Sequence, residues 1–76
     1  MTGARMLSMY ICVYLRDLPW AYSKMLDEER NVDYAADHEP IGVEFLNVSH
    51  GVNVDDLPEQ EAISHLLKEH NVKVFA

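Results

Sequence analysis

Two carboxylates are the side chains whose spacing most directly suggests chemistry in this chain. Asp33 and Glu44 lie in short segments that alternate apolar and polar residues, and a turn-rich stretch joins the two segments. If the segments form a hairpin, the carboxylates become neighbours, and paired carboxylates can divide acid and base roles between them. No nucleophile or recognisable pocket motif accompanies them. We therefore predict no catalytic residue, and a structural contact of Glu44 with Arg16 or Tyr14 across the sheet.

The single cysteine and the four histidines carry weaker signals. Cys12 lies between apolar neighbours, as a buried structural thiol does, and it has no partner for a disulfide. Glu61, His65 and Glu69 recur every four residues, a spacing that could hold a metal weakly but is more typical of a solvated helix face. The three glycines are scattered, so no phosphate-binding loop is present. We predict neither a metal nor a cofactor.

Length and charge restrict the class of protein. A chain of 76 residues forms one domain and buries only about 60% of its unfolded surface, a deficit that self-association commonly offsets. The net charge of −7 disfavours nucleic acid and would favour a basic protein partner, although acidic surfaces also keep proteins soluble. The longest apolar run, residues 9–15, is too short to cross a membrane. A lone cysteine fits a reducing, cytoplasmic location.

Alternating residues predict a sheet. In residues 9–16 the aliphatic odd positions suit a core, and the tyrosines and Cys12 at even positions face the other way. Residues 41–48 repeat this pattern, with Ile41, Val43 and Phe45 toward the core. Residues 30–34 form another strand, and residues 20–26 are ambiguous between a strand, slightly favoured, and a helical turn. Residues 1–8 lack a period, so we predict a frayed lead-in to a single domain over residues 9–76.

The C-terminal third predicts one helix and a last strand. Asp56 and Glu59 have the spacing of a capping box, and an apolar stripe follows them as far as His70. Residues 72–75 form a short strand, which would complete a right-handed βαβ unit if it pairs parallel to its neighbour. The predicted fold class is α+β: a small, mainly antiparallel sheet of three to five short strands, one C-terminal helix packed on one face, and a final short strand.

Four short motifs occur in an order that resembles a known family. The chain contains Cys12–Leu15, then Tyr22-Ser23, then Val32–Tyr34, then Gly42–Leu46 followed by a serine. In this order and spacing, residues 9–49 resemble the small bacterial proteins of the domain of unknown function 2283 family. The usual hairpin glycine is replaced by His-Glu-Pro at residues 38–40. The resemblance implies an antiparallel sheet, no established activity, and an antitoxin-like role beside small toxin-like proteins.

The strongest functional signal is a surface. If the outward tyrosines share one sheet face with Leu46 and Val48, that face is too apolar for water alone and marks an association site. We hypothesise a homodimer of two sheets packed face to face, in which Gly42 permits close approach and the charged side chains are polar insertions. The predicted interface comprises Tyr10, Cys12, Tyr14, Arg16, Gly42, Glu44, Leu46 and Val48.

These features predict a small cytoplasmic protein-interaction module that acts as a homodimer, with a basic protein as a further partner. The alternative is a small-ligand binder or enzyme that uses the carboxylates of Asp33 and Glu44. Converging carboxylates in a cleft would favour the alternative.

Overall fold

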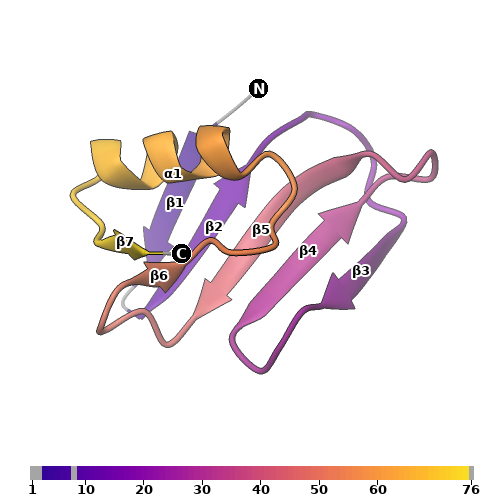
Figure 1. Cartoon of the computed structure of the whole chain (residues 1–76). Helices are drawn as coiled ribbons and strands as arrows, with labels where there is room; N and C mark the ends of the chain where they lie inside the picture. Colours follow the sequence, from indigo (N-terminus) through magenta and orange to yellow (C-terminus); the bar gives the residue numbers. More distant parts are fainter. Residues whose placement is uncertain (1–2, 8, 76) are drawn as a thin grey trace.

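The main element is a five-stranded antiparallel sheet with the strand order β1-β2-β5-β4-β3 (Figure 1). The computed structural model describes residues 3–7 and 9–75. Two hairpins, β1–β2 and β3–β4, flank the central strand β5. The strands are β1 (Gly3–Leu7), β2 (Tyr10–Tyr14), β3 (Tyr22–Met25), β4 (Arg30–Tyr34) and β5 (Pro40–Leu46).

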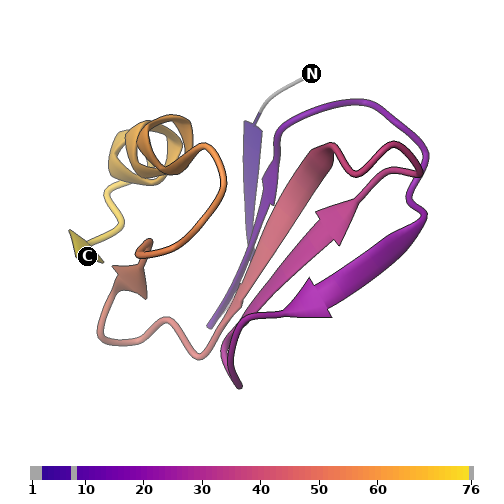
Figure 2. The ribbon, with the colours of Figure 1, turned by 45° about the vertical axis from the view of Figure 1, so that its right-hand side comes forward.

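A second layer contains the helix α1 (Gln60–Glu69) and two short strands, β6 (Val52–Asn53) and β7 (Val74–Phe75). The two strands pair in parallel, as expected for strands joined through a helix, but they form a separate small sheet. This layer lies on one side of the five-stranded sheet and leaves the other side bare (Figure 2). The predicted α+β fold class, with a final short strand after the helix, is confirmed.

The core lies between the two layers. Alternate residues of the central strands point toward the helix, and Val32 of β4, Val43 of β5 and Ile63 of α1 are completely buried. Burying each such side chain contributes about 1.5–3 kcal/mol relative to leaving it exposed. The remaining members of this cluster come from β2 and the residue after it, β5, β6 and the loop after it, and the helix: Ile11, Val13, Leu15, Phe45, Val52, Val54, Leu57 and Leu67.

The predicted lead-in was wrong for residues 3–7, which form β1. The pattern of this segment is weak because β1 is an edge strand, and its order comes from full pairing with β2, from Gly3 opposite Tyr14 to Leu7 opposite Tyr10. Residues 1, 2 and 8 lie outside the described residues. The next strand begins at Tyr10 rather than at Met9, which occupies the turn and is exposed.

The predicted capping box was also wrong. Glu59 is the N-cap residue, but it adopts the left-handed conformation (φ 52°) and its side chain makes no cap hydrogen bond. Its carboxylate instead pairs with the guanidinium of Arg16, at the end of the sheet. A long-range ion pair has therefore replaced the local contact that the spacing favours.

Candidate functional site

The bare side of the five-stranded sheet is the candidate site, and we call it the open face. Residues opposite one another in an antiparallel ladder project to the same side, so the register defines its members. Residues on the other side of the sheet form the covered face, beneath the helix layer. The open face comprises Gly3, Arg5, Tyr10, Cys12, Tyr14, Ser23, Met25, Asn31, Asp33, Gly42, Glu44 and Leu46.

Six residues of the predicted interface lie on this face, and two do not. Val48 packs against the hydrophobic core on the covered side. Arg16 lies beyond the end of β2, where its Nη1 donates to the carbonyl oxygen of Pro40 at 2.6 Å and pairs with Glu59. The predicted pairing of Glu44 with Arg16 was therefore wrong, because Arg16 has nearer acceptors at the sheet end, and the hydrogen-bond partners of Glu44 are Tyr10 and Asn31 rather than Tyr14.

Glu44 instead belongs to a row of hydrogen bonds that crosses the sheet. The hydroxyl of Tyr10 on β2 donates to Glu44 Oε2 on β5. Nδ2 of Asn31 on β4 donates both to Glu44 Oε1, at 2.8 Å, and to Asp33 Oδ1, at 3.2 Å. The carboxylates of Asp33 and Glu44, which were predicted to be neighbours, are thus joined by the side-chain amide of Asn31, which was not predicted as a site residue.

The row continues to the edge of the sheet. Ser23 Oγ on β3 donates to Asp33 Oδ1 at 2.5 Å, and the indole Nε1 of Trp20 donates to Ser23 Oγ at 2.8 Å. Hydrogen-bonded side chains therefore span four strands. The alternation in residues 30–34 was the available signal for Asn31, since it places Asn31 and Asp33 on one face, but Ser23 and Trp20 depend on strand pairing that the sequence left ambiguous.

The row affects proton binding at one end. The hydrogen bond from Tyr10 to Glu44 raises the pKa of the Tyr10 hydroxyl well above its ordinary value. A hydrogen bond with Cys12, the partial burial of Tyr10 and the charge of Glu44 act in the same direction. Tyr10 therefore remains a neutral donor throughout the physiological pH range.

A hollow opens beside this row, above Gly42. A Cβ atom at this position would lie only 2.8 Å from the carbonyl oxygen of Val13 and 3.8 Å from Asp33 Oδ2. The pairing of β4 with β5 is irregular here, because its register shifts between Asp33 and Tyr34. Such bulges change the direction in which neighbouring side chains point. The cavity of about 340 Å³, which we call the Gly42 hollow, has Tyr14, Leu18, Trp20, Asp33, Gly42 and Glu44 among the residues that line it.

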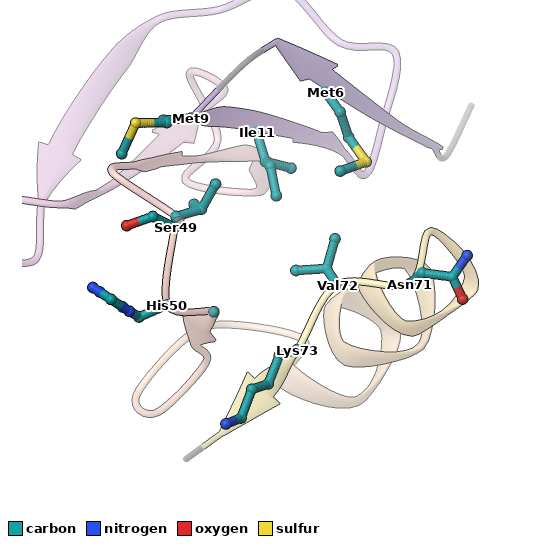
Figure 3. A pocket seen from close by; sticks show the side chains of 10 residues that line it. Met6, Met9, Ile11, Ser49, His50, Asn71, Val72 and Lys73 are labelled. Atoms are coloured by element: carbon teal, nitrogen blue, oxygen red, sulfur yellow. The ribbon is translucent and has the colours of Figure 1, made fainter.

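A larger cleft of about 560 Å³ lies between the sheet and the helix layer, but it gathers no comparable chemistry. Met6 and Ile11 project into it from the sheet toward Val72, whereas the side chains of His50 and Lys73 extend away from this gap (Figure 3). The cleft is thus a loosely packed extension of the core.

No group of three or more potential ligands (His, Cys, Asp or Glu) that could hold a metal ion occurs among residues 3–7 and 9–75. On the helix, His65 Nε2 and Glu69 Oε1 lie 2.8 Å apart in an exposed pair. Within the same described ranges, no helix is long and apolar enough to cross a membrane.

Comparisons of the chain with protein-family models, with curated proteins and with solved structures gave no match. The resemblance to the domain of unknown function 2283 family stays a prediction that rests on the four sequence motifs.

Proposed function

We propose that this protein is an interaction module that forms a homodimer through its open face. The observation that carries the proposal is the bare sheet surface opposite the helix layer, where Tyr14 is 46% exposed, Met25 53% and Leu46 38%. Trp20, 63% exposed, adds to this surface through its hydrogen bond to Ser23. Large side chains left in water on one continuous face are typical of an association site.

The composition of the open face also supports association. Tyrosine, tryptophan, methionine and arginine are enriched in protein interfaces, and lysine, aspartate, glutamate and serine are depleted. On the open face, the aspartate, glutamate and serine side chains are hydrogen-bonded to one another through the row. The open face has the first group, and the lysines of the chain lie elsewhere: Lys24 pairs with Val32 on the covered face, and Lys68 and Lys73 belong to the helix layer. The hydrogen-bonded row satisfies the polar groups that a partner would remove from water.

We place the protein in the bacterial cytoplasm, on the grounds of its lone cysteine and the family resemblance. The net charge of −7 supports a basic protein as a further partner, in an antitoxin-like role. Neither nucleic acid nor a membrane is part of the proposal.

The second candidate function is a small-ligand binder or enzyme, and the observation that favours it is the Gly42 hollow. Both Asp33 and Glu44 line this cavity, and Asp33 Oδ2 points over its floor. A soluble amine that raised the thermal unfolding temperature of the wild-type protein, but not of Asp33→Asn, would favour this function over the interaction module.

The homodimer is tested by sedimentation equilibrium between about 1 and 100 µM. We expect the wild-type protein to approach twice the chain mass of 8.7 kDa, and Leu46→Glu to remain monomeric. Leu26→Glu is the matched control, because Leu26 is 36% exposed, almost as much as Leu46, but lies in the β3–β4 turn outside the open face. A monomeric wild type, or a dimer that Leu26→Glu disrupts and Leu46→Glu does not, would overturn the proposal.

A further inference from the structure

The Gly42 hollow has the chemistry of a site for a cation. Asp33 Oδ2 lies beside its floor, Glu44 borders it, and two aromatic residues, Tyr14 and Trp20, are among the residues that line it. Carboxylates bind guanidinium groups through charge-assisted hydrogen bonds, and aromatic faces attract cations. Arg16 also reaches the cavity, but its guanidinium is already engaged with Glu59 and Glu39.

The open face has its own cation. Among the basic residues of the described chain, only Arg5 occupies a strand position on this face, opposite Cys12. Its side chain is exposed. Arg30 is held on the covered side, where its Nη1 donates to the carbonyl oxygen of Asp55 at 2.6 Å.

Arg5 and the carboxylates lie on one line across the sheet. Across the sheet, each residue of this line is paired with the next: Arg5 of β1, Cys12 of β2, Glu44 of β5 and Asn31 of β4. Neighbouring strands are about 4.8 Å apart, so β1 and β4 are separated by roughly 14 Å. Consider a two-fold axis that lies between two packed sheets, runs parallel to the strands and passes above the middle of the β2–β5 pair. This axis would bring β1 of the second copy over β4 of the first.

The same axis repeats the contact twice. In a two-fold interface, a contact between one residue of the first copy and another residue of the second copy occurs a second time with the copies exchanged. Each Arg5 would therefore face Asn31 of the other copy, between Glu44 and Asp33. Packed sheets lie about 10 Å apart, and an extended arginine side chain spans more than half of that gap. A chain with one open-face cation and two open-face carboxylates is thus complementary to itself in this arrangement.

We propose that Arg5 of each subunit contacts Asp33 and Glu44 of its partner from the Asn31 position, at the border of the Gly42 hollow, and thereby sets the register of the homodimer. The inference rests on the proposed open-face dimer and specifies its central contact. The cation at these carboxylates is therefore supplied by a second copy of this chain, whereas a free amine or a basic protein of another kind would bind there only in competition with the dimer.

The test is a pair of charge reversals, measured separately and then mixed. We expect Arg5→Glu and Asp33→Lys each to raise the dimer dissociation constant by at least about 100-fold, because each homodimer would contain two like-charge contacts. An equimolar mixture should dimerise within about tenfold of the wild type. In the mixed dimer, the carboxylate introduced by Arg5→Glu faces the ammonium introduced by Asp33→Lys, and the native Arg5 of the second chain faces the native Asp33 of the first.

Lys24→Glu is the matched control, since it makes the same charge change on the covered face and should leave the dissociation constant within about threefold of the wild type. Because Arg5 is exposed, its variant tests the contact even if Asp33→Lys does not fold, and Asp33→Asn then supplies the second measurement, with an expected loss of about tenfold. A wild-type dimer that Arg5→Glu does not weaken, or single variants that stay monomeric when mixed, would overturn this inference and leave the open-face dimer standing. A monomeric wild type would overturn both.

Discussion

Phe45 and Leu46 are adjacent on β5 and point to opposite faces of the same sheet. Phe45, on the covered face, is 2% exposed within the core, whereas Leu46, on the open face, is 38% exposed. The covered face contributes the apolar side chains of the core, and the open face combines exposed apolar groups with a hydrogen-bonded row. The two faces of one sheet therefore have different roles. The covered face stabilises the fold, and the open face remains available for a partner.

The sharpest test of this division compares the two neighbours directly. Phe45→Ala should reduce the free energy of unfolding by about 3–5 kcal/mol, because it removes a buried ring and leaves a cavity. Leu46→Ala should cost less than about 1 kcal/mol in the monomer, because its side chain already meets water. Urea denaturation at a protein concentration below the dimer dissociation constant measures both, and comparable losses would contradict the division.

The second test concerns the hollow on the open face. Gly42→Ala should cost about 1–3 kcal/mol, because its Cβ would meet the backbone oxygen of Val13 at 2.8 Å, and a backbone atom cannot move aside cheaply. Gly3→Ala is the matched control, since nothing lies within 4 Å of its Cβ position on the same sheet. Chemical denaturation of both variants decides the point: equal stability would show that the hollow does not depend on the missing side chain.

The smallest expected effect tests the polar row. Tyr10→Phe should lose about 1 kcal/mol at neutral pH, the usual contribution of one hydrogen bond. Because the folded-state pKa of Tyr10 is raised above its unfolded value, this contribution is complete below about pH 10 and is lost as the pH rises through the folded-state pKa. The stability difference between wild type and variant should therefore shrink only in strong alkali. A difference already lost by about pH 9 would place the cause elsewhere.

The sequence predicted most of what alternation controls. The patterns in residues 9–16 and 41–48 identified β2 and β5 and assigned Ile11, Val13, Val43 and Phe45 to the core, where the structure has them. The open-face positions of Tyr10, Cys12, Tyr14, Gly42, Glu44 and Leu46 follow from the same alternation. These assignments succeeded because side chains alternate between the two faces along any strand, whichever strands it pairs with.

The sequence could not predict what tertiary pairing controls. Residues 3–7 form a strand because each of them pairs with a residue of β2. Glu59 makes no capping hydrogen bond with its side chain because its carboxylate binds Arg16, which is 43 positions away. The same limit applies to the site, since Asn31 and Ser23 join the row only once β4 lies between β5 and β3. Strand order is non-local, and it determined which polar groups meet.

Cys12 was predicted to be a buried thiol, but it is only half-buried, because the open face has no layer over it. It gives the most direct measurement of the central claim, because it is the only cysteine of the chain and lies on the open face, opposite both Arg5 and Glu44. Its reaction rate with a thiol reagent such as Ellman's reagent should be measured from about 1 to 100 µM protein, alongside the mass of the species in solution. We predict that the rate falls in proportion to the fraction of dimer, whereas in the monomeric Leu46→Glu it is independent of concentration. A dimer whose Cys12 reacts as fast as that of the monomer would contradict the claim that the open face is the interface.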